Sequence, residues 1–158
     1  MVCTRIAAVV IVLGLFGCAK PKLIPNTKVT DNKLNRDILG VVEQYRRAME
    51  RLDSVGVLVL VHPTYQDQSG TPQADDDVDY TGLKRLLATR FKRTSKVRYR
   101  IEYQEVRVRH NEAEVDAYVD ATFVYQEPQA APRWRRLTDY NRFRLLKDGS
   151  NWRFVGGL

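Results

Sequence analysis

Side chains that carry most metal and nucleophile chemistry are scarce in this chain. Its 158 residues include two cysteines, Cys3 and Cys18, and two histidines, His62 and His110. A zinc site needs several such ligands at characteristic spacings, and the sequence has neither a serine nucleophile elbow nor a phosphate-binding glycine loop. His110 falls in an expected turn and His62 precedes a proline. The sequence therefore predicts no cofactor and no metal centre.

The chain also lacks an apolar run long enough to cross a membrane. As a helix, the apolar segment Ile6–Phe16 would reach roughly 17 Å, against about 30 Å for the hydrocarbon core of a bilayer. It follows Arg5 and leads into Leu15-Phe16-Gly17-Cys18. This tetrapeptide resembles the lipobox of bacterial lipoproteins, in which the cysteine is acylated and becomes the first mature residue. We therefore expect residues 1–17 to be an export signal and Cys18 to carry lipid.

The lipobox resemblance implies a lipid-anchored protein of the bacterial cell envelope. Ala19 resembles the signal that sorts lipoproteins to the outer membrane. Residues 18–29 contain two prolines and no periodicity, so we expect a tether. The net charge of +7 suits anionic envelope surfaces, whereas an exported protein is not expected to bind nucleic acid. The partners that we expect are the membrane through the lipid, an envelope protein or a small hydrophobic ligand, and a second copy through a sheet.

Residues 30–158 begin with helical patterns. An apolar stripe at three- and four-residue steps predicts a helix that starts near Thr30-Asp31 and ends near Leu52. Asp53-Ser54 can cap a second helix through about Val61, although this stretch is rich in valine, which favours strands. Its short length and its place after the first helix favour a helix.

A polar segment, Gln66–Val78, separates the second helix from a third. It contains the acids Asp75, Asp76 and Asp77, but their spacing fits no calcium-binding EF-hand loop and no glutamate closes it, so we expect a solvated loop. The third helix should be capped near Asp79 and end near Arg93.

From Lys96 onward apolar residues alternate with polar ones, which predicts β-strands. The alternation slips by one residue near Gln104-Glu105, which indicates a β-bulge that bends the sheet. Lys147-Asp148-Gly149-Ser150 predicts a hairpin turn before a final strand. The predicted fold class is α+β, with three N-terminal helices packed on a curved, bulged antiparallel sheet.

The predicted turns set a register for the strands. In the first hairpin we expect Tyr103 opposite Ala117, Ile101 opposite Val119 and Tyr99 opposite Ala121. In the second we expect Ala121 opposite Asp139, Val119 opposite Asn141 and Ala117 opposite Phe143. Opposite charges then meet on the outer face, as in Arg100-Asp120-Tyr140, Glu102-Tyr118-Arg142 and Asp116-Arg144. The inner face would carry Asp139 and Asn141 beside alanines, which leaves room for a pocket lined by Tyr99, Ala121, Asp139 and Asn141. Alternatively, Asp139 accepts structural hydrogen bonds there.

Three stretches carry a further resemblance: the helical Ile38–Met49, the His62-Pro63-Thr64-Tyr65 after the second helix, and the closing Asp148–Phe154. Their order resembles the cone-shaped NTF2-like superfamily, which includes SnoaL-like polyketide cyclases and ketosteroid isomerases. The resemblance covers residues 30–158 and implies a helix-covered conical sheet.

Enzymes of this superfamily use an Asp or His base and Tyr or Asp oxyanion donors. Here the resemblance implies Asp139 as base, with Tyr99 or Tyr103 as donors. Because the chain is otherwise sparse in chemistry, we expect a non-catalytic binding or scaffold domain. The alternative is a pocket enzyme of isomerase, cyclase or dehydratase type acting on a small hydrophobic substrate.

Overall fold

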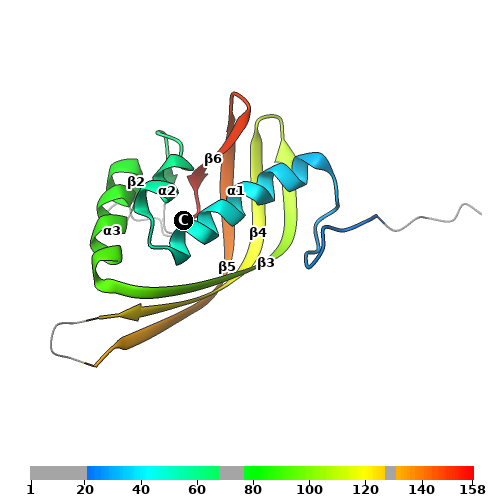
Figure 1. Cartoon of the computed structure of the whole chain (residues 1–158). Helices are drawn as coiled ribbons and strands as arrows, with labels where there is room; N and C mark the ends of the chain where they lie inside the picture. Colours follow the sequence, from blue (N-terminus) through cyan, green and yellow to red (C-terminus); the bar gives the residue numbers. More distant parts are fainter. Residues whose placement is uncertain (1–20, 68–76, 127–130) are drawn as a thin grey trace, which may run out of the picture.

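Helices cover one face of a four-stranded antiparallel sheet (Figure 1), so the chain is α+β as predicted. The computed structural model describes residues 21–67, 77–126 and 131–158. The helices are α1 (Lys33–Glu50), α2 (Ser54–Val59) and α3 (Tyr80–Arg93). The sheet has the order β3-β4-β5-β6, made of β3 (Thr94–Arg109), β4 (Glu112–Tyr125), β5 (Arg133–Asp148) and β6 (Asn151–Gly156).

Short polar side chains begin each helix. Asp53 and Asp79 accept hydrogen bonds from the backbone of Gly56 and Gly82, which confirms the predicted caps of α2 and α3. The predicted start of α1 near Thr30-Asp31 is wrong by one or two residues, because Asn32 is the N-cap. Asn caps a helix as well as Asp does, and the carboxylate of Asp31 instead binds Arg36.

The second helix ends two residues earlier than predicted. The helix α2 stops at Val59, and Val61 then forms a parallel bridge with Phe154 of β6. His62 donates its backbone N–H to the Phe154 carbonyl at 2.8 Å. Of the valines in this stretch, Val61 is therefore extended, whereas Val55, Val57 and Val59 lie in the helix.

The loop predicted over Gln66–Val78 is paired at both ends. Gln66–Asp67 forms β1 and Val78–Asp79 forms β2, and the two make a separate antiparallel pair. The acids Asp75 and Asp76 lie outside the described residues.

The sheet is strongly curved, so that the ends of its long strands pass beneath α3 (Figure 1). The register of β3 and β4 shifts between Tyr103 and Glu105, which confirms the predicted bulge, and a second shift lies between Thr94 and Lys96. Tyr99 pairs with Ala121 and Tyr103 with Ala117, as predicted for this hairpin. Bulges add twist and bend a sheet, which here makes its helix-facing side concave.

The predicted register of β4 and β5 is wrong by two residues. Leu137 lies opposite Ala121, where Asp139 was expected, and Asp139 lies opposite Val119. A shift by two keeps each side chain on its predicted face, so the alternation of apolar residues does not reveal it. The charge pattern does not reveal it either, because Asp116 meets Arg142 instead of Arg144 and keeps an opposite charge.

The β3 edge of the sheet is covered by α1 and by part of the segment expected to be a tether, whose Val29 is buried. On strand β3, the Tyr99 N–H donates to the Glu50 carboxylate of α1 at 3.0 Å. Farther along this edge, the Tyr103 carbonyl accepts from the Lys28 backbone at 3.1 Å. Such cover removes a site for unwanted strand pairing.

No helix within the described residues is long and apolar enough to cross a membrane.

Candidate functional site

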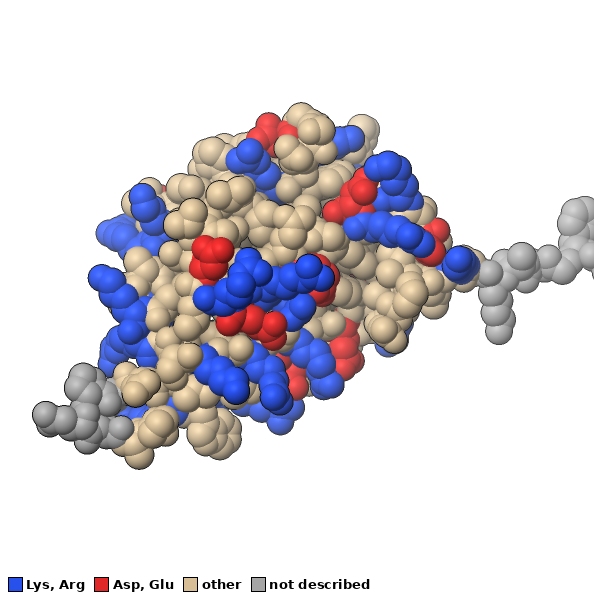
Figure 2. Space-filling view, in the orientation of Figure 1, with Lys and Arg blue, Asp and Glu red and all other residues tan. Residues whose placement is uncertain are grey.

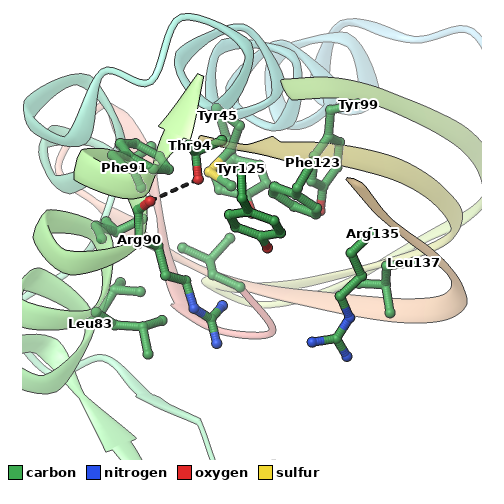
Figure 3. Close-up of a pocket in the computed structure, with 15 residues that line it drawn as sticks. Tyr45, Leu83, Arg90, Phe91, Thr94, Tyr99, Phe123, Tyr125, Arg135 and Leu137 are labelled. Carbon is green, nitrogen blue, oxygen red and sulfur yellow. Dashed lines mark hydrogen bonds between the residues drawn. The ribbon is translucent and has the colours of Figure 1, made fainter. Parts of the chain in front are cut away.

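A cavity of about 330 Å³ opens between the helices and the concave face of the sheet (Figure 3). All of the helices and three strands contribute to its lining. The apolar lining residues are Met49, Val57, Leu83, Leu86, Leu87, Phe91, Phe123, Leu137 and Leu158, and the lining residues with polar groups are Tyr45, Arg90, Thr94, Tyr99, Tyr125 and Arg135. The cavity is therefore largely apolar, with a few polar groups at defined places.

The helix α3 forms one wall of the cavity because of its apolar spacing. Leu83, Leu86 and Leu87 lie three and four residues apart and project from one side of the helix, and Phe91 continues that side. Leu83 and Leu87 are buried, whereas Leu86 and Phe91 are half-buried. The wall is thus apolar at its base and partly open farther out.

Two tyrosines stand at the deep end of the cavity. The rings of Tyr45 and Tyr99 meet edge to face with centroids 5.7 Å apart. Burial raises the pKa of the Tyr45 hydroxyl well above its ordinary value, and the adjacent Tyr99 adds to this effect. Burial also raises the pKa of Tyr99. Both phenols therefore stay protonated at neutral pH.

The outer part of the cavity carries cations. Figure 3 shows the guanidinium groups of Arg90 on α3 and Arg135 on β5 on either side of Tyr125, toward the open side. Thr94 is not available as a donor there, because its hydroxyl already donates to the Arg90 carbonyl at 2.7 Å.

This arrangement can bind and orient a ligand, but it offers little to move a proton. Phenols and guanidinium groups donate hydrogen bonds and remain protonated at neutral pH. The described lining residues include no carboxylate and no imidazole that could accept a proton. The chemistry that this lining supports is therefore the recognition of a molecule with an apolar body and an acceptor group.

The structure separates the residues that the sequence assigned to one pocket. Tyr99 lines the cavity, whereas Ala121 is fully buried beneath it. Asp139 is exposed, and its carboxylate accepts a hydrogen bond from its neighbour, the backbone of Tyr140, at 2.7 Å. Asn141 donates to the Gly157 carbonyl at 2.8 Å. The prediction that the Asp139 carboxylate is buried in the pocket is therefore wrong, because the two-residue shift of β5 places Leu137 at the cavity instead.

Tyr103, the other expected oxyanion donor, is also outside this cavity. Its hydroxyl donates to the Glu43 carboxylate of α1 at 2.7 Å, and Glu43 in turn accepts from Arg46 at 2.8 Å. Burial and the neighbouring Glu43 carboxylate raise the pKa of Tyr103. The residue joins the helix to the sheet. The predicted lipidation residue, Cys18, lies outside the described residues.

Sequence reasoning missed the two arginines of the cavity, although a signal was present. Arg90 follows Leu83 by seven residues and Leu87 by three, so it belongs to the apolar side of its helix. Arg135 has the same parity as the inward Leu137 and Phe143 on its strand. An arginine at a position where the helical spacing or the strand alternation predicts a core residue indicates a cavity or an opening.

Comparison with solved structures identifies the architecture. A proposed dehydratase of the NTF2-like family from Streptomyces avermitilis matches with a TM-score of 0.60 at 13% identity, over 78% of this chain and 92% of that chain. A ketosteroid isomerase-like protein from Erwinia carotovora atroseptica matches with a TM-score of 0.62 at 17% identity, over 80% and 95%. The chain has the NTF2-like fold.

Other neighbours with the NTF2-like architecture differ in the activity given to them. A proposed aromatic ring hydroxylase from Novosphingobium aromaticivorans matches with a TM-score of 0.67 at 14% identity, over 80% of this chain and 89% of that chain. Models of known protein families and curated proteins give no match to the chain. Identities this low establish the NTF2-like fold alone, because one fold hosts many functions.

Proposed function

We propose that the chain is a lipid-anchored protein of the bacterial cell envelope whose NTF2-like domain binds a small hydrophobic molecule and releases it unchanged. The observation that carries the binding role is the cavity of about 330 Å³ with apolar walls and a few hydrogen-bond donors. Small-molecule sites in proteins typically have this size and this balance of apolar walls and few polar groups.

The lining supports binding more than it supports catalysis. Isomerases and dehydratases, the activities named for some structural neighbours, need a group that takes a proton from the substrate. The paired phenols of Tyr45 and Tyr99 could stabilise an oxyanion, but the described lining supplies no base beside them. Asp139, which the sequence suggested as that base, is exposed on β5 and is not among the lining residues.

Titration of the purified full-length chain with the neutral fluorophore N-phenylnaphthylamine tests the binding role. Leu86 lines the cavity and is half-buried, so Leu86→Trp should fill the space and abolish the fluorescence increase. The matched control is Leu34→Trp, since Leu34 is 41% exposed on α1 and does not line the cavity. Circular dichroism confirms that both variants fold. Equal binding by both variants, or none by the unaltered chain, would contradict the proposed role.

The proposed location rests on Cys18 and the apolar segment before it. Two buried acyl chains hold a protein stably to a bilayer, since each buried methylene contributes about 0.8 kcal/mol. Cys18→Ser should therefore move the protein from the membrane fraction to the soluble fraction. Ser54→Ala, which leaves the lipobox intact, serves as the control. Retention of the Cys18→Ser protein on the membrane would defeat the lipid anchor.

A further inference from the structure

The mouth of the cavity is surrounded by arginines from two elements. Arg90 and Arg135 line the cavity itself. An adjoining hollow of about 330 Å³ shares Arg90 and Tyr125 and adds Arg93 and Arg133. Two of these arginines come from α3 and two from β5, so arginines that are distant in the sequence line the cavity and the hollow beside it.

The surface around this opening is basic as well. The helix α3 carries Lys84, Arg85, Arg90, Lys92 and Arg93 and no acidic residue between Tyr80 and its end. In Figure 2, the charged side chains on the α3 side of the molecule are mostly lysine and arginine. Like charges gathered at one place repel each other, and an anion between them removes this repulsion.

Several arginines elsewhere on the sheet are paired with acids. Arg142 and Arg107 both bind Asp116, at 2.7 and 2.9 Å, and Arg136 binds Asp120 at 2.8 Å. By contrast, none of the four arginines at the cavity mouth forms an ion pair with an acid in the part of the chain that the structure describes. Within the described residues, the positive charge at the opening is therefore not neutralised by an acid.

The buried part and the open end of the cavity differ in the lining residues that they offer, which fits a ligand with an apolar end and a charged end. The buried part of the lining includes Met49, Val57 and Tyr45. The open end offers Arg90, Arg135 and the Tyr125 hydroxyl (Figure 3). A guanidinium group binds a carboxylate through two parallel hydrogen bonds, which gives both strength and orientation. A molecule with an apolar body and an anionic head would satisfy both ends at once.

Resting on the binding role proposed above, we infer that the ligand of this cavity is a small amphipathic carboxylate. Its apolar body lies between α3 and the sheet, and its carboxylate lies at the mouth between Arg90 and Arg135. The arginines supply selectivity for the anion, and the apolar walls supply affinity for the body. The two contributions can be measured separately.

The test is displacement of N-phenylnaphthylamine from the full-length chain by decanoate and by decanol, which share an apolar chain and differ in charge. Decanoate should bind about tenfold more tightly than decanol, and its affinity should fall with added sodium chloride. Arg90→Gln and Arg135→Gln should each weaken decanoate by about tenfold and leave decanol unchanged. Arg85→Gln is the matched control, because it removes the same charge from α3 away from the cavity lining.

The outcomes separate the ligand class from the binding role. If decanoate and decanol bind equally, or if Arg90→Gln and Arg135→Gln act like Arg85→Gln, the carboxylate is overturned while the binding role stands. If the neutral fluorophore and decanol both fail to bind the unaltered chain, the proposed binding role itself fails. Circular dichroism of each variant shows that a loss of binding is not a loss of fold.

Discussion

Leu137 lies directly opposite Ala121 across β4 and β5, at the place where the sequence suggested Asp139. This pairing puts a leucine at the cavity and moves the carboxylate to the exposed part of the concave face. It changes the character of the site from an acid-base pocket to an apolar one with a cationic mouth.

Asp139→Asn should leave ligand binding and stability unchanged. Its carboxylate is exposed and accepts one local hydrogen bond from the Tyr140 backbone, a bond that an amide oxygen can also accept. Fluorophore titration and urea unfolding measure the two quantities. A loss of binding as large as that of Leu86→Trp would show that Asp139 takes part in binding the ligand.

Tyr103→Phe should destabilise the domain by about 1.5 kcal/mol, because it removes a partly buried hydrogen bond to the Glu43 carboxylate. Tyr140→Phe is the matched control, since Tyr140 is 70% exposed and its substitution should cost little. The free energy of unfolding comes from urea titrations. Equal values for the two variants would show that the contact between Tyr103 and Glu43 contributes nothing.

Lowering the pH should decrease the stability of the domain, partly because Asp116 becomes protonated. Hydrogen bonds from Arg142 hold the pKa of this carboxyl below its ordinary value of 3.8 against the opposing effect of burial, and Arg107 adds to the lowering. A lowered folded pKa contributes stability above the unfolded value and loses it as the pH falls through the folded value. Thermal unfolding of Asp116→Asn should therefore depend less on pH below about 4 than that of the unaltered chain. An unchanged dependence would contradict the assignment.

Two glycines should respond to alanine in opposite ways. Gly157 has a φ of +86°, and a Cβ there would collide with the Arg142 carbonyl, so Gly157→Ala should destabilise the domain by more than about 1 kcal/mol. Gly40 lies within α1 with nothing within 4 Å of its Cβ position, so Gly40→Ala should stabilise by about 0.5–1 kcal/mol. Thermal melting of the two variants checks both signs.

The order of elements was predictable because local rules determine it. Three features follow from side chains that are close together in the sequence. They are the caps Asp53 and Asp79, the apolar stripe of α1 and the bulge after Tyr103. The first hairpin was also predictable, since its turn is short and the slip in alternation places the bulge. These features determined the α+β class and which side chains face the helices.

The site was not predictable in the same way, because it depends on distances between elements. Alternation specifies the face of each residue on β5 but not its position along β4, since a shift by two residues keeps every face. The connection between Tyr125 and Arg133 is longer than the turn between Arg109 and Glu112 in the first hairpin, so it does not fix that position. Only the tertiary structure therefore decided that Leu137 and Arg135, and not Asp139, line the cavity.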